Sequence, residues 1–291
     1  MRVGLIGVGT MGGRMGPRLL AGGHELTVND VRPEAATELR EAGATWAEDP
    51  AGVAKASEVV LTSLPNPAVI EQVAEELMEA MTPGSVYVDI STSPPALARK
   101  LTEAFGKRDI AVLDAPLSSG GVFTTVGGDE DVFERCRPVF EAMCEHVLYV
   151  GRTGMGQVTK LVRQHVSFGS FILEAEALLI CAKAGGDVKA VAEFLSASVG
   201  RSQFHARAMD RVFKRDFGTP ENSSAKLDIV AKDLSLAVDA AREVDAPVHM
   251  GTYVADVLRR GQDQGWGRNE FWSAVQVLEQ EAGCELSADV E

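Results

Sequence analysis

The chain has 291 residues, with 28 Lys and Arg against 42 Asp and Glu, and its formal net charge is −14. This charge repels phosphate backbones and anionic lipids, which argues against nucleic-acid and membrane-surface partners. The length is typical of two domains. No run of about 18 apolar residues is present and the first residues do not resemble a secretory signal, so we predict a cytoplasmic protein.

The cysteines are few and widely spaced. They are Cys136, Cys144, Cys181 and Cys284. They form no C-x-x-C pair, so the sequence indicates neither a disulfide framework nor a zinc site. We expect small buried side chains at these positions and no bound metal.

The first half of the chain alternates between short runs rich in β-branched residues and amphipathic stretches of helix length. The predicted strands are residues 2–6, 25–29, 58–63, 85–90, 110–115 and 147–150. Strands that alternate with helices pair in parallel, and nearly continuous apolar strands fit a sheet covered on both faces. We therefore predict an α/β fold with a Rossmann-type, doubly wound sheet.

The second half of the chain carries helical patterns without a strand signal. After a glycine-punctuated link, residues 157–184 contain no proline and predict one long helix. Further helices follow, with breaks near residues 217–224, 245–247 and 261–267.

These patterns divide the chain near residue 152. We predict a dinucleotide-binding domain at residues 1–152 and an all-α C-terminal domain for substrate binding and oligomerisation at 153–291, joined by the long interdomain helix. Within that helix, residues 171–182 are hydrophobic on more than one face. This predicts a homodimer or homotetramer.

A glycine-rich turn follows the first predicted strand. Gly7, Gly9 and Gly12 have the spacing G-x-G-x-x-G, a helix is predicted after them, and an acid, Asp30, ends the second strand. In this setting the glycines allow a tight turn, the approach of a pyrophosphate and close packing of helix against strand. The pattern predicts a dinucleotide site, and the alternative is a turn that serves packing alone.

Asp30 bears on which dinucleotide binds. Its carboxylate can accept hydrogen bonds from ribose hydroxyls and repels a 2′-phosphate, which favours NAD. Arg32 could instead contact the 2′-phosphate of NADP, or it is a solvated side chain before Pro33. Thr10 and Asn29 complete the cofactor contacts predicted from the turn and the second strand.

Several segments together resemble the β-hydroxyacid dehydrogenase family, whose members include 3-hydroxyisobutyrate dehydrogenase and, as a larger relative, 6-phosphogluconate dehydrogenase. These segments span nearly the whole chain and are GLIGVGTMGG, LPNP, VDISTSPP, DAPLSSGG, GRTGMGQVTKLVRQ and KDL. The resemblance implies an NAD(P)-dependent oxidoreductase that acts on a small anionic hydroxy acid or aldehyde.

The resemblance also implies further cofactor contacts. Met11 takes the place of a residue near the nicotinamide, and Leu64 and Pro65 belong to a cofactor-lining loop. Thr92 and Lys232 are the remaining two contacts. Thr92 is also explained as part of a helix start, and Lys232 as a solvated lysine on a helix.

The family further implies how the substrate is held. Ser118 takes the place of a serine that holds the substrate carboxylate together with glycine N–H groups, here that of Gly120. Ser119 stands where the family has a glycine, and the segment after Gly120 is several residues shorter than usual. Since serine adopts a positive φ only at a cost, we expect the loop geometry to differ.

Lys160 and Gln164 lie four residues apart on the predicted long helix and share one face. Alcohol oxidation needs a group that accepts the hydroxyl proton, and a partly desolvated lysine suits this role. The family implies this proton-accepting role for Lys160. The alternative is a lysine on the protein surface without a catalytic role. Gln164 replaces the usual asparagine and would orient the substrate. Ser167 stands where a decarboxylating relative has an acid, which argues against decarboxylation.

The sequence thus predicts an NAD-dependent oxidoreductase that transfers hydride between nicotinamide and a small acid resembling 3-hydroxyisobutyrate, with Lys160 as general acid and base. One alternative is a reductase of tartronate semialdehyde, glyoxylate or succinic semialdehyde. Others are an imine reductase on the same fold and a dinucleotide-binding scaffold without catalysis. The presence of both Lys160 and Gln164 argues against the scaffold.

Overall fold

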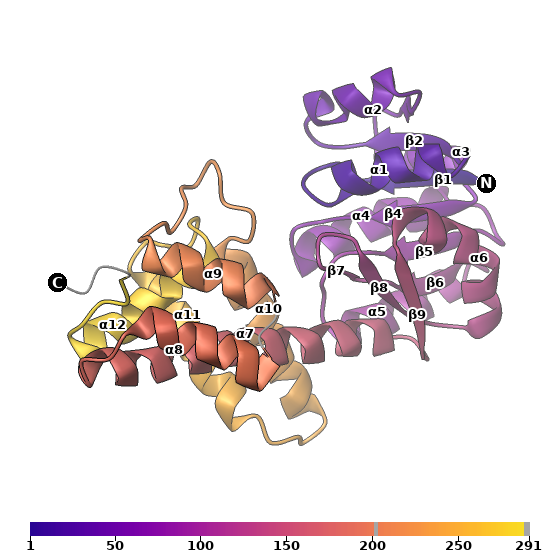
Figure 1. Cartoon of the computed structure of the whole chain (residues 1–291). Helices are drawn as coiled ribbons and strands as arrows, with labels where there is room; N and C mark the ends of the chain where they lie inside the picture. Colours follow the sequence, from indigo (N-terminus) through magenta and orange to yellow (C-terminus); the bar gives the residue numbers. More distant parts are fainter. Residues whose placement is uncertain (201–202, 288–291) are drawn as a thin grey trace. The chain divides into compact units, whose positions relative to one another are not determined.

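The structure, a computed structural model, describes residues 1–200 and 203–287. The chain divides into two compact units, Met1–Lys160 and Leu161–Glu291, called unit 1 and unit 2 below. Figure 1 shows the strand-rich part in indigo to magenta and the helical part in orange to yellow. The division falls within the predicted long helix, beyond the boundary expected near residue 152.

Unit 1 is built on a nine-stranded sheet with the order β3-β2-β1-β4-β5-β6-β8-β7, and β9 pairs with β8. The strands are β1 (Arg2–Ile6), β2 (Glu25–Asn29), β3 (Thr45–Trp46), β4 (Val59–Thr62), β5 (Val86–Asp89), β6 (Ala111–Asp114), β7 (Leu117–Ser118), β8 (Phe123–Gly127) and β9 (His146–Gly151). Strands β1 to β6 pair in parallel, and the order runs outwards from β1 in both directions. This confirms the predicted doubly wound Rossmann-type sheet.

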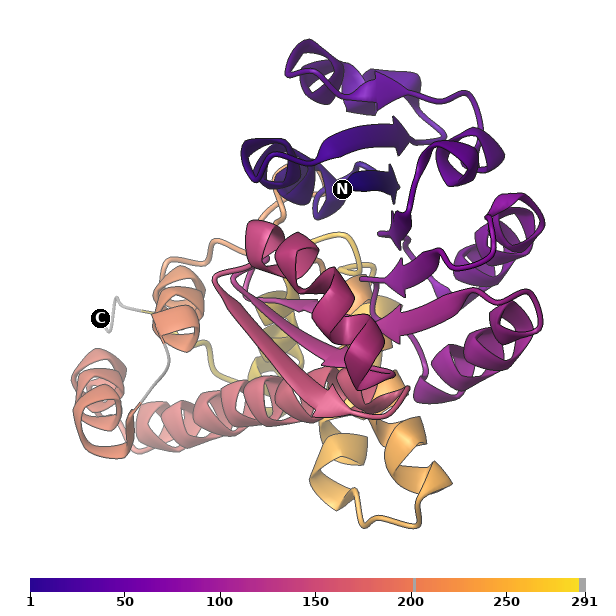
Figure 2. The ribbon, with the colours of Figure 1, turned by 90° about the vertical axis from the view of Figure 1, so that its right-hand side faces the viewer.

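Helices connect these strands and lie on both sides of the sheet (Figure 2). They are α1 (Gly12–Ala21), η1 (Pro33–Ala36), α2 (Thr37–Glu41), α3 (Pro50–Ala56), α4 (Pro67–Ala80), α5 (Pro95–Gly106) and α6 (Glu130–Met143). Side chains fix where some of them begin. Asp49 accepts a hydrogen bond from the N–H of Gly52 at the start of α3, and Asn66 accepts one from the N–H of Val69 at the start of α4.

Alternating side chains of the central strands enter two separate cores. Val59, Leu61 and Val88 pack in the cluster that contains residues of α1 and α6. Val60 and Tyr87 pack in the cluster formed with α3, α4 and α5. All five are at most 1% exposed. Because successive strand residues point to opposite faces, covering both faces requires the continuous apolar strands seen in the sequence.

The structure adds strands that the sequence patterns did not predict. The β7–β8 hairpin pairs Leu117 with Thr124 and Ser118 with Phe123, and β8 also pairs in parallel with β9. Threonine and glycine make up much of β8, so its sequence carries little of the apolar pattern that marks a strand.

The cysteines differ in burial. Cys136 and Cys144 lie in a core of unit 1, and burial raises the pKa of each thiol to about 11. Cys181 and Cys284, in unit 2, are partly exposed, so the expected burial applies only to the first pair.

Unit 2 consists of helices. After α7 (Met155–Lys183), which begins in unit 1, these are α8 (Val188–Leu195), η2 (Ser196–Gly200), α9 (Gln203–Phe213), α10 (Leu227–Glu243), α11 (His249–Asp263), η3 (Phe271–Ala274) and α12 (Val275–Ala282). Phe271 lies at the centre of its core, with ring centroids 5.2 Å from Phe168 and 5.0 Å from Phe171. Its described residues contain no β-strand, which agrees with the predicted all-α domain.

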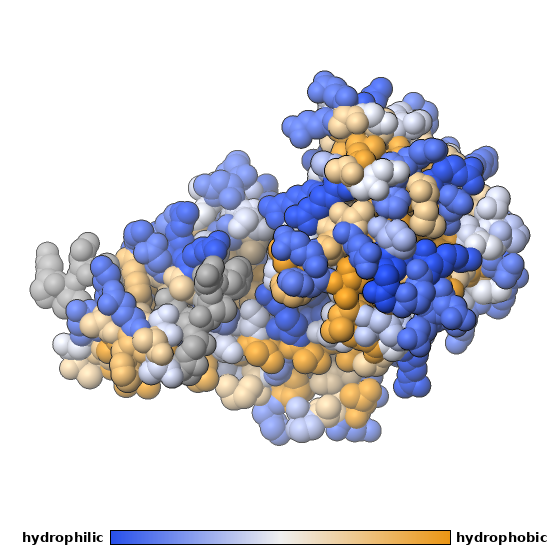
Figure 3. Space-filling model, turned by 45° about the vertical axis from the view of Figure 1, so that its right-hand side comes forward, coloured by the Kyte–Doolittle hydropathy of each residue, from blue (hydrophilic) through white to orange (hydrophobic). Residues whose placement is uncertain are grey.

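One face of α7 remains exposed. Val162, Val166, Leu173 and Ile180 are 59%, 61%, 56% and 73% exposed, and their spacing places them on one side of the helix. Orange apolar side chains are visible among blue polar ones on the surface in Figure 3. By length and composition, α7 is the one helix among the described residues that is apolar enough to cross a membrane. Because its other face packs in the core of unit 2, we interpret it as a core helix.

Candidate active site

The glycine turn joins β1 to α1. Gly7 has a φ of 85°, and a side chain there would collide with the carbonyl oxygen of Ser63. A side chain on Gly12 would collide with the carbonyl oxygen of Gly7, whereas Gly9 has open space beside it. Close backbone approach therefore requires glycine at 7 and 12, and the open side at Gly9 leaves room for a phosphate.

Asp30 lies beside this turn. Its Oδ2 accepts a hydrogen bond of 2.9 Å from the N–H of Val8, and its Oδ1 accepts one of 2.9 Å from the N–H of Arg32. The Arg32 Nε lies 3.8 Å from Asp30 Oδ1. The guanidinium is thus drawn to the carboxylate, which weakens the case that Arg32 is aimed at a 2′-phosphate.

A hollow of about 850 Å³ contains this turn. The predicted cofactor residues that line it are Gly7, Gly9, Thr10, Met11, Asn29, Asp30, Leu64 and Pro65. The structure therefore brings most of these residues to one concave surface of unit 1, and the open glycine turn fits the phosphates of a dinucleotide. Gly12 lies just behind the hollow at the start of α1, and Lys232 belongs to unit 2.

Thr92 lies in the segment that follows β5. The neighbouring Ser91 accepts a hydrogen bond of 2.9 Å on its Oγ from the N–H of Leu64, and its own N–H donates to Asp89 Oδ1 at 3.0 Å. The segment around Thr92 is thereby tied to the loop that carries Leu64 and Pro65. Thr92 itself is half-buried.

The loop between β7 and β8 carries the predicted substrate-binding residues. Ser119, Gly120 and Gly121 have φ values of 52°, 70° and 90°, and the N–H of Gly121 donates to the carbonyl of Ser118 at 3.0 Å. Ser119 therefore adopts the left-handed conformation that a glycine would take, despite the cost that serine incurs there. The turn hydrogen bond and the flanking glycines hold it there, at a cost of about 1 to 2 kcal/mol.

Lys160 lies in the second turn of α7 and is only 7% exposed. Its Nζ donates to the carbonyl oxygen of Leu117 at 2.8 Å. Leu117 immediately precedes Ser118, so the amine lies next to the loop that would hold the substrate acid group. This excludes the alternative of an exposed surface lysine.

Asp114 fixes the start of α7, a role that our sequence analysis missed. Its Oδ1 accepts from the N–H of Gly154 at 2.7 Å and its Oδ2 accepts from the N–H of Gln157 at 2.8 Å. The Gln157 side chain in turn accepts from the N–H of Ser93 and donates to the carbonyl of Ser91. These bonds anchor the first turn of α7 to the strand ends, three residues before Lys160.

Burial perturbs the acids at these strand ends. It raises the pKa of Asp114 to about 7, with the hydrogen bonds from Gly154 and Gln157 acting in the opposite direction. Asp89, its partner in the β5–β6 register, is also buried, and burial raises its pKa as well. An acid at the end of a parallel strand, as in the DAP of DAPLSSGG, was the available sequence signal.

Gln164 lies one turn after Lys160 and belongs to unit 2. Its Nε2 donates to Asp233 Oδ2 at 2.7 Å, and its Oε1 accepts from the guanidinium of Arg163. Lys232 Nζ forms an ion pair with Asp233 Oδ1 at 3.2 Å. Among the described residues, this buried oxygen accepts no hydrogen bond. Asp233, which follows Lys232 in KDL, is a second residue that the sequence analysis missed.

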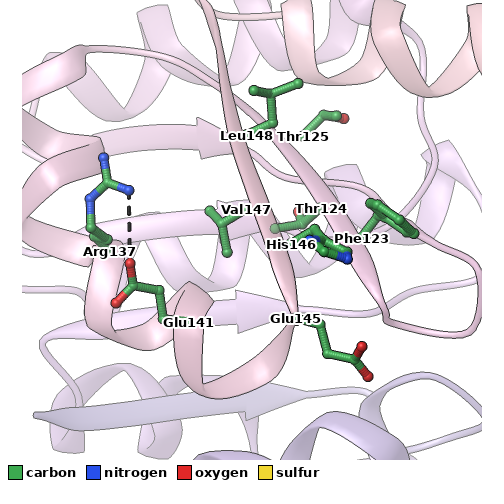
Figure 4. Close-up of a pocket in the computed structure, with 9 residues that line it drawn as sticks. All are labelled: Phe123, Thr124, Thr125, Arg137, Glu141, Glu145, His146, Val147 and Leu148. Atoms are coloured by element: carbon green, nitrogen blue, oxygen red, sulfur yellow. Dashed lines mark ion pairs between the residues drawn. The ribbon is translucent and has the colours of Figure 1, made fainter.

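A separate hollow of about 520 Å³ lies over β8, β9 and α6 (Figure 4). Its basic residue, Arg137, is ion-paired with Glu134 and Glu141. Phe123 stacks on His146 with ring centroids 4.5 Å apart. Because these acids already neutralise the guanidinium of Arg137, this hollow is a weaker candidate site for an anionic ligand than the surface around Lys160.

Two families of known proteins match the sequence. Residues 2–151 match the family described as the NAD binding domain of 6-phosphogluconate dehydrogenase. Residues 154–278 match the family described as NAD-binding of NADP-dependent 3-hydroxyisobutyrate dehydrogenase.

Individual proteins are similar over almost the full length. Mitochondrial 3-hydroxyisobutyrate dehydrogenase of Mus musculus is 30% identical, with 96% of this chain and 87% of the mouse protein covered. The NAD-dependent L-serine dehydrogenase of Pseudomonas aeruginosa is 32% identical, with 95% and 97% covered. A solved structure of 3-hydroxyisobutyrate dehydrogenase from Mycobacterium tuberculosis with L-serine has a TM-score of 0.86 at 25% identity, with 96% and 99% covered.

Replacing Asp114 by asparagine removes a buried ionisable group. Because folding raises the pKa of Asp114 to about 7, the folded state holds this proton more tightly than the unfolded chain does. Its contribution to stability is fully present below about pH 4 and is lost as the pH rises through about 7. The unfolding free energy of the wild type should therefore decline relative to that of Asp114→Asn over this range, measured by denaturant titration at several pH values.

Asp109→Asn is the matched control, since Asp109 is an exposed aspartate of the same unit. We expect its difference from the wild type to change little with pH. A difference for Asp114→Asn that stays constant between pH 4 and pH 7 would contradict the assignment of a perturbed carboxyl.

Proposed function

This chain belongs to the β-hydroxyacid dehydrogenase family of NAD(P)-dependent oxidoreductases, and on this basis we propose that it interconverts a small 3-hydroxy acid and the corresponding semialdehyde, with Lys160 as general acid and base. The observation that carries the proposal is the position of Lys160. Its amine is buried, yet it lies one residue from the loop that would hold the acid group of the substrate.

Lys160 would move the hydroxyl proton. In oxidation its Nζ accepts the proton of the substrate hydroxyl, and in reduction it returns a proton to the carbonyl oxygen. Bound NAD(P) supplies the hydride acceptor or donor. Because reduction runs through the same proton transfer in reverse, one residue serves both directions. Reduction of a semialdehyde is thus the reverse of the same step.

Ser118, Ser119 and Gly120 would orient the acid group. Within residues 1–200 and 203–287, the N–H groups of Ser119 and Gly120 donate to no protein acceptor, so they remain available for an oxyanion. In unit 2, the amide of Gln164 is held by Asp233 and Arg163 and would contact the substrate.

We further propose that NAD is preferred over NADP. The Asp30 carboxylate lies at the hollow that contains the glycine turn, and it attracts Arg32. A 2′-phosphate would meet this carboxylate, whereas ribose hydroxyls would donate to it. Gly7, Gly9, Gly12, Thr10, Met11, Asn29, Leu64, Pro65, Thr92 and Lys232 are the other proposed cofactor contacts. The cytoplasmic location stays a prediction.

We also propose that the chain forms a homo-oligomer through the exposed face of α7. Leu173 and Ile180 are more than half exposed on a helix whose other face is buried, and such apolar faces are typical of subunit contacts. A second copy of the same chain offers an equally apolar partner.

The Lys160→Ala variant tests the mechanism. We expect kcat to fall by a factor of about 10² to 10⁴, the usual contribution of a general acid or base, while the NAD dissociation constant changes less than about twofold. The rate is followed by NADH absorbance with 3-hydroxyisobutyrate, 3-hydroxypropionate and L-serine as substrates. The dissociation constant of NAD is measured by calorimetric titration. Lys160→Met, which keeps the length of the side chain, should behave in the same way.

Lys107→Ala, an exposed lysine of unit 1, is the control and should keep the wild-type rate. If Lys160→Ala retained most of its turnover, the proton transfer would have to be assigned to another group.

The Asp30→Ser variant tests the cofactor preference. Removal of the carboxylate ends its repulsion of a 2′-phosphate and leaves Arg32 without its partner. The ratio of kcat/KM for NADP over that for NAD should rise by about tenfold or more, equivalent to ~1.4 kcal/mol. Glu48→Gln, an exposed acid on the rim of the same hollow, should leave the ratio unchanged. An unchanged ratio in Asp30→Ser would refute the role of Asp30.

The double variant Leu173→Glu/Ile180→Glu tests the oligomer. Burying carboxylates in an apolar contact is costly, so the particle should dissociate to a monomer in light scattering after size exclusion. Val244→Glu, which replaces an equally exposed apolar residue of unit 2 outside α7, should keep the wild-type mass. A monomeric wild type, or an intact oligomer in the double variant, is incompatible with an interface on this face.

A further inference from the structure

Two arginines of α1 reach the loop between β7 and β8. Arg18 Nη1 donates to the carbonyl of Gly121 at 2.8 Å and to that of Met143 at 2.7 Å. Arg14, one turn earlier, places its Nη1 3.0 Å from the position that a Cβ on Gly120 would occupy. Arg18 thus ties the loop to α1, and the guanidinium of Arg14 lies against the same loop.

Arg14 differs from Arg18 in having no partner. Its guanidinium forms no hydrogen bond and no ion pair with any of the described residues, and the residue is exposed. Some other arginines of unit 1 are neutralised by acids, as Arg137 is by Glu134 and Arg108 is by Glu79. In a chain with a net charge of −14, a guanidinium beside Gly120 that has no acidic partner leaves a local surplus of positive charge.

We propose that Arg14 is a specificity-determining residue that binds the acid group of the substrate. The proposal rests on the proposed function, because the acid group belongs to the molecule on which Lys160 acts. The guanidinium and the N–H groups of Ser119 and Gly120 approach one oxyanion from two sides. A planar guanidinium suits a carboxylate or a sulfonate through paired N–H donors.

Lys160 and Arg14 contact the same short stretch of chain. Lys160 is hydrogen-bonded to Leu117, and Arg14 lies at Gly120. The hydrogen bond from Gly121 to Ser118 closes a turn, and the ends of such a turn lie within about 7 Å of each other. These contacts on one short stretch fit a small substrate, such as a 3-hydroxy acid, whose hydroxyl and carboxylate are separated by only a few bonds.

The competing ligand for Arg14 is the pyrophosphate of the cofactor. Arg14 lies in the first turn of α1, which the glycine turn precedes. Its guanidinium, however, is directed at Gly120 and not at the open side of Gly9. Arg14 is also absent from the residues that line the hollow around the turn. The geometry favours the acid group of the substrate.

The Arg14→Gln variant separates these ligands. With 3-hydroxypropionate as the probe and NAD saturating, KM should rise roughly ten- to hundredfold, the loss expected for charge-assisted hydrogen bonds, and kcat should change less. The NAD dissociation constant should stay within about twofold of the wild type. Arg14→Lys, which keeps the charge but not the fork, should recover part of the loss. Arg135→Gln, an exposed arginine of α6, controls for net charge and should keep the wild-type KM.

Two outcomes would overturn the proposal. A weaker affinity for NAD with an unchanged KM for the acid would assign Arg14 to the cofactor, and unchanged values of both would make it a solvated side chain. A binding experiment tests the contact without turnover. It compares two NAD-saturated proteins, the single variant Lys160→Ala and the double variant Lys160→Ala/Arg14→Gln, and measures their affinity for 3-hydroxypropionate by calorimetry. If the wild type oxidised no hydroxy acid, the proposed function would fail, whereas equal binding to these two proteins would refute only the role of Arg14.

Discussion

The position of the predicted catalytic helix turn in unit 1 depends on one buried carboxylate, that of Asp114. Asp114 accepts two backbone N–H groups at the start of α7, where helices have no internal partners for their first N–H groups. Glycine is required around it, because a side chain on Gly127 would lie 2.7 Å from Asp114 Oδ1 and one on Gly156 would lie 2.8 Å from Oδ2. A residue that caps a helix from a distant strand thus helps to fix the position of Lys160.

The site also shows how an acidic chain can receive anionic ligands. Its net charge is −14, yet the surfaces that would hold phosphate and carboxylate are made of glycine N–H groups, hydroxyls and few basic side chains. Backbone N–H groups carry no counter-charge that an acid elsewhere on the surface could neutralise, and the positive end of α1 adds to their effect. Overall charge therefore says little about which ligands a recessed site accepts, since the field there is set within a few ångströms.

The parts of the fold that could be predicted from the sequence are those with strong local patterns. The buried parallel strands, the glycine turn and the long helix each appear where the apolar periodicity and the glycine spacing place them. The β7–β8 hairpin does not, because Thr124 and Thr125 gain their strand partners from residues distant in sequence. Ser119 adopts its left-handed φ for a similar reason: the closed turn around it overrides the preference of the residue.

The same distinction holds for the candidate site. Lys160 and Gln164 were recognisable because their segment resembles the family's, and their spacing along one helix places them on one face. Asp114 and Arg14 were not, since their partners at Gly154 and Gly120 lie 40 or more positions away along the chain, and no local pattern records such a contact. The roles of a buried acid and of an arginine without an acidic partner can be recognised only in the folded structure.

The distribution of cysteines has a practical consequence. Each unit carries its own pair of thiols, Cys136 and Cys144 in unit 1 and Cys181 and Cys284 in unit 2. A thiol reacts as its thiolate, and burial both shields the first pair and raises their pKa to about 11. Alkylation of this pair must therefore await local opening of unit 1, so that the rate of modification at each cysteine, followed by mass spectrometry, reports the opening of one unit independently of the other.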